Sequence, residues 1–164
     1  MTQKTTPNFI DRHGTDFLRI SLGVVFIWFG FLKFFDATSP AEIIAGDTIS
    51  LLTFDSIKPN VSLPMLAVLE CIIGIGLLTK GLMRYIIPLL YFQMIGAILP
   101  LLIFVDDCWN GLFIPTLLGQ YIIKNSILIS AAIVLGVVSK GGELIADPVV
   151  AEKAKTIENQ KVEE

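Results

Sequence analysis

The chain has 164 residues, of which 54% are hydrophobic and 16% are charged, and its formal net charge is −3. Soluble domains contain about 25% charged residues, so this composition favours a one-domain integral membrane protein. The basic residues are scattered and form no patch with interleaved aromatic residues, which argues against nucleic-acid binding. The one histidine, His13, lies outside the apolar segments, so we expect no histidine-based metal, haem or catalytic site built by this chain alone.

The first apolar segment follows the polar residues 1–16 and extends from Phe17 to Phe35. Its length of about 19 residues matches the hydrocarbon core of a bilayer. A cleaved signal peptide is the alternative, but this segment is too long for the apolar part of one and contains Arg19 and Lys33. We therefore expect it to be retained as a membrane-spanning helix.

A short helix is predicted within the connection that follows, residues 36–62. Ser39 is a suitable N-cap, Pro40 suits the first helical position, and Glu42 lies three residues after the cap. Apolar and polar residues are then mixed at helical spacing. We expect an amphipathic helix over residues 40–55, too short and polar to span, that lies in the interface or caps the bundle.

Three further apolar segments are long enough to span a bilayer: Leu63–Thr79, Tyr85–Val105 and about Gly119–Ser139. Pro100 removes a backbone hydrogen bond to Gly96 and should kink the third span. Between the third and fourth spans, residues 106–111 are predicted to form a turn and residues 112–118 to return toward the membrane.

These segments predict an all-α integral membrane protein, an up-down four-helix bundle with a short outer amphipathic helix. Its parts are an N-terminal segment (1–16), a membrane domain (17–140) and a polar tail (141–164), in which residues 151–164 should be loosely ordered. Small residues that suit close helix contacts are Gly23, Gly30, Gly74, Gly76, Gly96 and Ala97.

The two cysteines are expected to be free thiols. Cys71 should lie roughly 13 Å below the end of its span at 1.5 Å per residue, whereas Cys108 lies in a polar loop. A disulfide needs Cα atoms within about 7 Å of each other. This separation therefore excludes a disulfide between them.

The distribution of lysine and arginine predicts the orientation in the membrane. Most of them lie at the two termini and in the loop between the second and third spans: Lys4, Arg12, Lys80, Arg84, Lys140, Lys153, Lys155 and Lys161. The two opposite loops contain only Lys58. The positive-inside rule therefore places both termini in the cytoplasm.

Polar residues inside the spans are the candidates for function. Glu70 lies in the middle of the second span, where a carboxylate costs about 3 kcal/mol on insertion scales. Gln93 should lie at the same depth, and Lys124 and Lys33 above it, within reach of long side chains. We expect a buried cluster of Glu70, Gln93, Lys124 and Asn125, with Lys33 as a further candidate member.

In this cluster Glu70 is the candidate ionisable centre and Lys124 its counter-charge, with Gln93 and Asn125 as orienting groups. Lys33 and Arg19 are further candidates for substrate or quinone binding, and Arg19 should anchor the cytoplasmic end of the first span. Two alternatives stay open for these residues. The Glu70 pair can be a structural ion pair that fixes helix order, and Arg19 and Lys33 can be snorkelling residues.

Three stretches resemble the DoxX-like family of small four-span bacterial membrane proteins. The first runs from Leu18-Arg19 through Phe29-Gly30 to Lys33-Phe34. The second comprises Glu70, Gly74, Gly76 and residues 77–81. The third comprises Pro115-Thr116-Leu117 and the sequence Gly-Gln-Tyr-Ile-Ile-Lys-Asn of residues 119–125. The resemblance covers roughly residues 17–140 and implies a four-helix membrane fold in the bacterial cytoplasmic (inner) membrane.

The resemblance also implies a function, because relatives have been linked to thiosulfate:quinone oxidoreductase subunits and to oxidative-stress complexes. We therefore expect a redox-associated membrane subunit, an accessory protein rather than a self-contained enzyme, with a quinone as the candidate cofactor and no metal. Its expected partners are the lipid bilayer, an oxidoreductase subunit and further copies of the chain. The alternatives are a small proton- or ion-coupled transporter or channel subunit and a non-catalytic assembly protein.

Overall fold

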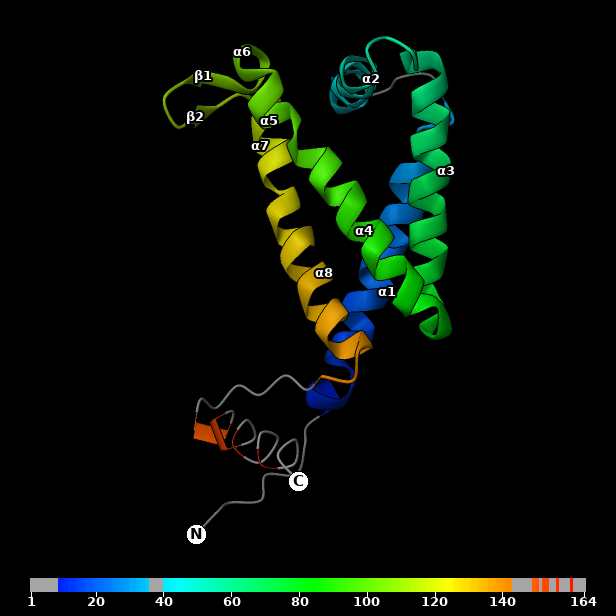
Figure 1. Ribbon diagram of the computed structural model, residues 1–164, viewed down its shortest axis with the longest axis vertical. Coiled ribbons are helices and arrows are strands. Elements are labelled where there is room, and N and C mark those ends of the chain that lie inside the picture. The colour runs from blue at the N-terminus through cyan, green and yellow to red at the C-terminus, as the bar shows by residue number, and fades with distance from the viewer. Residues whose placement is uncertain are drawn as a thin grey trace.

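The computed structural model describes residues 9–35 and 40–142, together with residues 149, 150, 152, 153, 156 and 160 (Figure 1). The long helices are α1 (Phe9–Leu32), α3 (Pro59–Leu78), α4 (Met83–Ile98) and α8 (Asn125–Ser139). The shorter elements are α2 (Pro40–Leu52), the 3-10 helix η1 (Lys80–Leu82), α5 (Pro100–Ile103), α6 (Val105–Cys108), the strands β1 (Trp109–Gly111) and β2 (Ile114–Pro115), and α7 (Leu117–Ile123).

Four helical stretches in the described part of the chain are long and apolar enough to cross a membrane. They are His13–Leu32, Pro59–Leu78, Lys80–Ile103 and Leu117–Ser139, with 20 to 24 residues each. Each overlaps one of the four predicted spans, so the predicted all-α membrane bundle is confirmed. The main difference lies at the start, because α1 begins at Phe9 and is helical before the predicted span begins.

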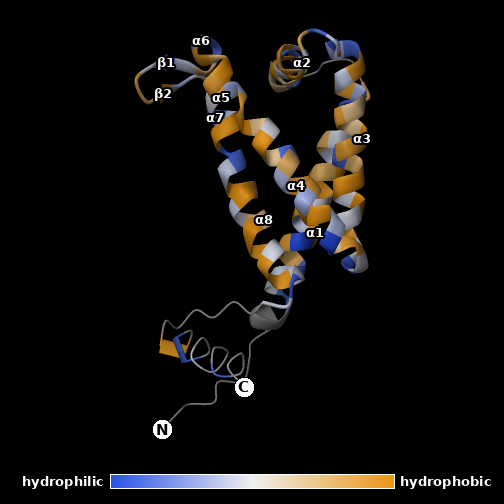
Figure 2. Ribbon diagram, viewed as in Figure 1, coloured by the Kyte–Doolittle hydropathy of each residue, from blue (hydrophilic) through white to orange (hydrophobic). Residues whose placement is uncertain are grey.

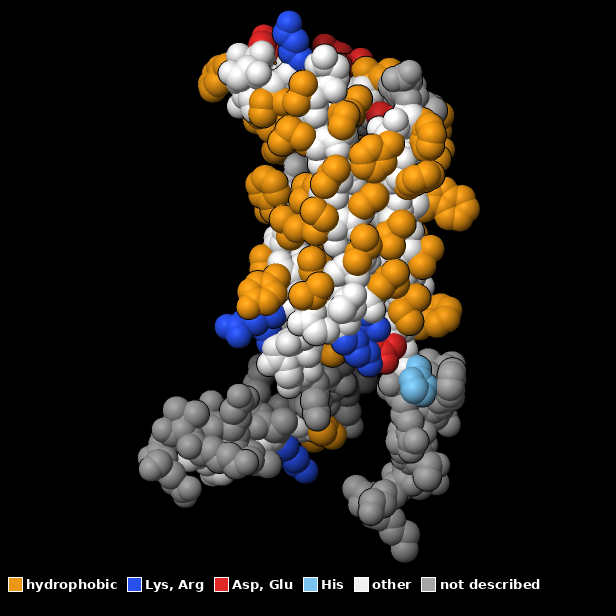
Figure 3. All heavy atoms as spheres, turned by 90° about the vertical axis from the view of Figure 1, so that its right-hand side faces the viewer, with side chains coloured by type: hydrophobic (Ala, Val, Ile, Leu, Met, Phe, Trp, Pro, Cys, Tyr) orange, Lys and Arg blue, Asp and Glu red, His pale blue; other side chains and the backbone are white. Residues whose placement is uncertain are grey.

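The outer surface of the bundle is apolar. Each span exposes large apolar side chains, among them Trp28 of α1 (65% exposed), Met65 of α3 (58%), Phe92 of α4 (70%) and Ile127 of α8 (69%). Figure 2 shows hydrophobic residues along the four long helices, and Figure 3 shows apolar side chains over the height of one face with charged ones toward its two ends. Such a surface is stable only in contact with lipid, as in a multi-pass membrane protein.

The bundle consists of two closely packed helix pairs. α1 packs along α3, and α4 packs along α8, while α3 also contacts α4 and α1 contacts α8 (Figure 1). The core between the pairs contains fully buried apolar side chains from three helices, Ile73 and Leu77 of α3, Leu90 of α4 and Leu135 of α8. Toward the end that carries α2, the two pairs diverge (Figure 1).

Glycines allow the close approach of α1 and α3. A Cβ atom at Gly74 would lie 2.6 Å from Ile27 Cγ1 and 2.7 Å from the Gly23 carbonyl oxygen, and one at Gly30 would lie 2.9 Å from Glu70 Cβ. Gly76 makes a comparable close approach to Ile86 of α4. These positions confirm the predicted contacts, whereas Gly96 was predicted wrongly, since a Cβ there would meet nothing within 4 Å.

Pro100, which was predicted to kink the third span, lies at a break in it, because α4 ends at Ile98 and α5 begins at Pro100. A second break was not predicted. α7 ends at Ile123 and α8 begins at Asn125, and the amide of Ile127 donates to the Lys124 carbonyl oxygen at 3.1 Å, a tighter turn than an α-helix makes. The fourth span is therefore two helical segments.

The helix predicted at residues 40–55 is α2, and it ends earlier, at Leu52. Phe54 and Asp55 adopt left-handed backbone conformations, and the amide of Asp55 donates to the Ser50 carbonyl oxygen at 2.8 Å. This is the Schellman arrangement that stops a helix. α2 packs on α3 and buries Glu42, Ile44 and Thr48, so it caps this end of the bundle. The predicted cap, Ser39, lies outside the described residues.

Between the third and fourth spans the structure forms α6 and a short antiparallel hairpin, β1–β2, where we predicted a turn and a returning segment. The hairpin pairs Trp109 with Pro115 and Gly111 with Ile114. Strands of three and two residues are too short to show a periodic pattern in the sequence. Residues 9–16 of the predicted N-terminal segment belong to α1, and most of the predicted polar tail lies outside the described residues.

Candidate functional site

Three polar side chains from three helices meet inside the bundle. The Lys33 ammonium donates to Glu70 Oε2 at 2.7 Å, and the Gln93 amide donates to Glu70 Oε1 at 3.0 Å. Glu70 and Gln93 are each only 8% exposed, and the side chain of Lys33 is 13% exposed. Both carboxylate oxygens of Glu70 are therefore paired, one by a cation and one by a neutral donor. We call these three residues the Glu70 cluster.

The Glu70 cluster lies at mid-depth in the span. Glu70 is about 16 Å from the Pro59 end of α3 and about 12 Å from the Leu78 end, at 1.5 Å per residue. Gln93 comes from the interior of α4, while Lys33 follows directly after α1. A charged group at this depth is stabilised by a partner within the bundle, as Lys33 provides here.

Gly30 explains how Lys33 reaches Glu70. The absence of a side chain at Gly30 lets the backbone of α1 approach α3 beside Glu70 and Cys71. Lys33 lies three residues further along, on the same face of the helix, and its amide donates to the Gly30 carbonyl oxygen at 3.2 Å. The close contact and the cation are therefore supplied by the last turn of α1 and the residue that follows it.

A third ionisable group, Glu42, interacts with the Glu70 cluster. Glu42 belongs to α2, is 7% exposed and interacts electrostatically with Glu70. In the sequence analysis Glu42 was assigned only a role at the start of a helix. Its burial depends on how α2 folds back over the bundle, and no local pattern in the sequence indicates that.

Lys124 is not the counter-charge of Glu70 in the structure, and the predicted pairing is wrong. Lys124 is exposed, and its ammonium lies 4.9 Å from the centre of the Tyr121 ring. Counting residues indicated the depth of Lys124 in the membrane. It did not indicate the direction in which the Lys124 side chain points, because that direction is set at the break between α7 and α8. Asn125, predicted as an orienting group, is the half-buried first residue of α8.

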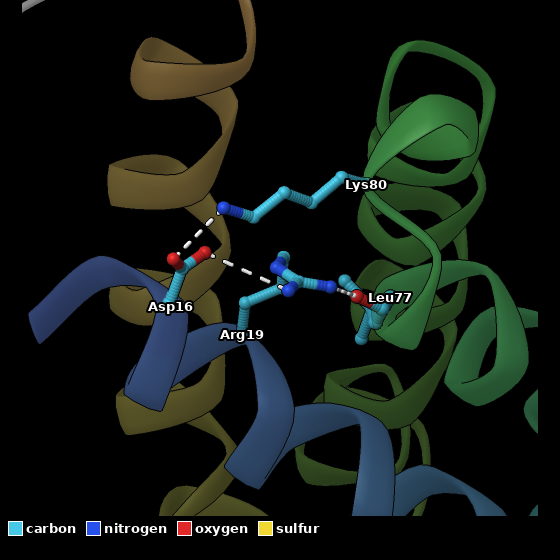
Figure 4. Close-up of polar contacts among 4 residues, drawn as sticks. All are labelled: Asp16, Arg19, Leu77 and Lys80. Atoms are coloured by element: carbon cyan, nitrogen blue, oxygen red, sulfur yellow. Dashed lines mark hydrogen bonds and ion pairs between the residues drawn. The ribbon is translucent and has the colours of Figure 1, made fainter. Parts of the chain in front are cut away.

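Arg19 forms a separate cluster near the other end of α1 and α3 (Figure 4). Its guanidinium donates to the Leu77 carbonyl oxygen and lies 3.6 Å from the Asp16 carboxylate, which also pairs with the Lys80 ammonium at 2.8 Å. Leu77 is in the last turn of α3, where carbonyl oxygens lack helical partners and a cation is favourable. Arg19 is buried rather than snorkelling, and it anchors α3 to α1.

The structure therefore divides the predicted site residues into separate groups. Lys33 and Arg19 are 14 residues apart on the α1 side of the bundle, which corresponds to about 21 Å along a helix. Arg19 accordingly cannot contribute to the Glu70 cluster. Within the described residues, no three His, Cys, Asp or Glu side chains are grouped so that they could hold a metal ion.

Both cysteines are free, as predicted. Cys108 is fully buried rather than a loop thiol, and its Sγ donates to the Pro100 carbonyl oxygen at 3.5 Å. Burial, together with the nearby Asp107 carboxylate, raises the pKa of the Cys108 thiol above its ordinary value. Cys108 is thus part of the packing between α2, α6 and α7, where it contacts Ile44 and Ile122.

Four apolar spans around a buried polar cluster define a multi-pass integral membrane protein in contact with the lipid bilayer. The chain belongs to the DoxX family, whose model matches residues 14–105. The matched residues include Arg19, Lys33, Glu70 and Gln93, whereas Lys124 and Asn125 lie outside them. No curated protein matches the chain, and no solved structure does.

Proposed function

We propose that this protein is a redox-associated membrane subunit that binds a quinone or docks an oxidoreductase in the bilayer. The observation that carries the proposal is the Glu70 cluster, a buried carboxylate paired by Lys33 and Gln93 at mid-depth. Membership of the DoxX family supports it. Ionisable residues inside membrane bundles are rare, and many of them form substrate sites or proton relays.

The residues of the cluster have the chemistry that a quinone head group requires. The Lys33 ammonium and the Gln93 amide are donors suited to a quinone carbonyl oxygen. The Glu70 carboxyl group can exchange a proton with that oxygen when the quinone is reduced or oxidised. Electrons would come from the partner oxidoreductase, so the chain acts as an accessory subunit.

An apolar hollow on α1 is a suitable place for a quinone tail. It has a volume of about 450 Å³ and is lined by Val24, Ile27, Trp28, Phe31 and Leu32, the last of which directly precedes Lys33. This lining is wholly apolar and lies on the lipid-facing side of α1, so it would hold only the tail of the quinone.

The test is to purify the wild type and the Glu70→Gln variant in mild detergent, extract bound small molecules and quantify quinones by chromatography. Near-stoichiometric quinone in the wild type and its loss in Glu70→Gln are the expected results. Lys124→Gln is the matched control, because Lys124 is exposed and contacts Tyr121 rather than Glu70, so it should retain quinone. The absence of quinone from all three proteins would refute the quinone-binding proposal.

A proton- or ion-coupled transporter is the second candidate, and Glu42 is the observation that favours it. Two buried carboxyl groups, Glu42 and Glu70, lie near enough to interact, one on the capping helix α2 and one at mid-depth. Such a pair could relay a proton between the α2 end and the bundle interior. Reconstituted liposomes that show no flux, and no difference between the wild type and Glu70→Gln, would exclude transport.

An assembly protein is the third candidate, because both oxygens of Glu70 already have partners within the chain. The cluster would then specify only how α1, α3 and α4 pack. In that case Glu70→Gln should lower abundance and thermal stability without any separate functional defect.

We further propose that the protein lies in the bacterial cytoplasmic membrane with both termini in the cytoplasm. The described basic residues support this orientation, since Lys80, Arg84 and Lys140 lie on the α3–α4 and C-terminal side and Lys58 on the α2 side. Single cysteines introduced at Lys80 and Lys58 in a Cys71→Ala background test it. In intact cells, an impermeant thiol reagent should label position 58 and not position 80.

A further inference from the structure

The tip of the β1–β2 hairpin is a strongly exposed apolar feature near the α2 end of the bundle. Its two turn residues, Leu112 and Phe113, are 86% and 84% exposed, and Ile114 after them is 60% exposed. In water three adjacent exposed apolar side chains would be unfavourable. We propose that this hairpin is a membrane anchor, whose Leu112 and Phe113 side chains insert among phospholipids at the boundary of head groups and acyl chains.

The position of the hairpin in the fold favours lipid as its occupant. It connects the third span, which ends at Ile103, to the fourth, which begins at Leu117, and therefore lies at the level where two spans leave the bilayer. Figure 1 shows that it projects sideways from the bundle rather than along its long axis, and Figure 2 shows a hydrophobic tip. A sideways projection at this level keeps the tip in the plane of the membrane interface.

The apolar tip is continuous with the lipid-facing surface. Exposed apolar residues flank the hairpin as well, namely Leu102 (74%) and Leu117 (70%) at the ends of the spans and Val105 (52%) in α6. The side chains of Asp106, Asp107 and Asn110 are exposed at its base. An apolar tip with a polar base is the distribution that an interfacial element requires.

The backbone conformation of Phe113 at the tip is also consistent with a functional role for its side chain. Phe113 has a φ of +60°, in the left-handed region where glycine and asparagine are favoured in two-residue hairpin turns. A bulky residue at such a position costs free energy, and strain of this kind is found where a side chain has a function. Burial of the aromatic ring in the interface would offset that cost.

The base of the hairpin is fixed to the bundle, so the tip is held in one place. The Trp109 indole donates to the Leu101 carbonyl oxygen at 3.1 Å, and the Thr116 amide donates to the Cys108 carbonyl oxygen at 2.9 Å. Gly119 of α7 approaches that same carbonyl so closely that no side chain would fit there. A rigid base means that insertion of the tip would fix the height of α5 and α7 in the bilayer.

The test uses the full chain in phosphatidylcholine liposomes with an environment-sensitive fluorophore on a single introduced cysteine. The background is Cys71→Ala, and Cys108 is retained because it is fully buried. Treating this background with the fluorophore checks that Cys108 is not labelled. Phe113→Cys and Leu112→Cys report the tip. Asn110→Cys, exposed at the base of the same hairpin, is the matched control.

With iodide present on both sides of the vesicle, the orientation of the protein does not affect the result. Iodide should quench the labels at positions 112 and 113 about threefold less than the label at position 110. Lipids that carry a nitroxide near the head group should quench the labels at positions 112 and 113 more strongly than the label at position 110. Equal iodide quenching at all three positions would overturn the anchor. The tip would then be exposed to water and available to a soluble partner.

Discussion

The Lys33 ammonium lies 2.7 Å from the Glu70 carboxylate, although 37 positions separate the two residues in the sequence. The contact exists because Gly30 brings α1 against α3 at the level of Glu70. A buried ion pair depends on both partners, since removing one leaves an uncompensated charge whereas removing both can be nearly neutral. The pair is therefore expected to behave as a unit.

Each single substitution at this pair should lower the free energy of unfolding substantially. The double substitution should lower it by less than the sum of the two single losses. Lys33→Met and Glu70→Gln should each lower the free energy of unfolding by about 3 to 5 kcal/mol, because each leaves a buried partner unpaired. The double variant should recover part of this loss. The measurement is unfolding in detergent followed by circular dichroism.

Lys124→Met is the control for this cycle. Lys124 is exposed and contacts the Tyr121 ring, so its loss should cost about 1 kcal/mol or less. If the losses at Lys33 and Glu70 simply added, or if Lys124→Met were the more damaging lysine substitution, the assignment of Lys33 as the counter-charge would be wrong.

Substitution of Gly74 by alanine should disrupt the packing of α1 on α3. The new Cβ atom would lie 2.6 Å from a side-chain carbon of Ile27 and 2.7 Å from the Gly23 carbonyl oxygen, so the helices must separate. Overpacking of this kind costs about 1 to 3 kcal/mol. Thermal unfolding in detergent measures the loss.

The matched variant for Gly74→Ala is Gly96→Ala on α4. A Cβ atom there meets nothing within 4 Å, and alanine is the better helix former, so this change should be neutral or stabilise by up to about 1 kcal/mol. Equal destabilisation by both variants would mean that Gly96 faces a neighbour in the assembled protein, such as a second copy of the chain.

The spans and the Glu70 cluster differ in how far the sequence predicts them. Twenty apolar residues predict a span without any tertiary information, and the cost of burying Glu70 predicts that it has a partner. Which lysine pairs with Glu70 depends on the rotation of each helix about its axis, and that is determined by contacts such as the one at Gly30. Residue counting therefore gave the depth of Lys124 but the wrong partner.

Features that depend on chain reversal were likewise not predictable from the sequence. Glu42 is buried because α2 folds over the bundle, and Cys108 is buried because α6 packs on α7 and brings the thiol into a cluster with Ile44 and Ile122. Neither residue lies in a periodic pattern that indicates its burial. Pro100, by contrast, acts through its own missing amide, so the break it causes could be predicted locally.

Arg19 should contribute to stability more than an arginine near a membrane surface usually does. Arg19→Met removes the donor to the Leu77 carbonyl oxygen at the end of α3 and should cost about 1 to 3 kcal/mol in the free energy of unfolding. Lys80→Ala, which removes an exposed lysine from the same cluster, should have little effect. Equal effects of the two substitutions in detergent unfolding would argue against the role of Arg19 as an anchor.

The Cys108 thiol should be unreactive while the protein is folded. It has no exposed surface, and its raised pKa lowers the thiolate fraction that alkylating reagents require. In a Cys71→Ala background, iodoacetamide at pH 8 should label the folded protein negligibly and the denatured protein completely.

The stability of the protein should also depend on the ionisation of Cys108. Because the folded protein holds the Cys108 thiol proton more tightly than the unfolded chain does, the stabilisation from the neutral thiol is complete below the ordinary thiol pKa and declines as pH rises above about 8.5.

Cys108→Ala provides the control for that pH dependence. Its melting temperature should fall less steeply above about pH 8.5 than that of the Cys71→Ala parent, because it has no thiol to ionise. Rapid, complete labelling of Cys108 in the folded protein at pH 8 would show that the contact between α2, α6 and α7 opens readily. In that case α2 would be a mobile cover over the Glu70 cluster rather than a fixed cap.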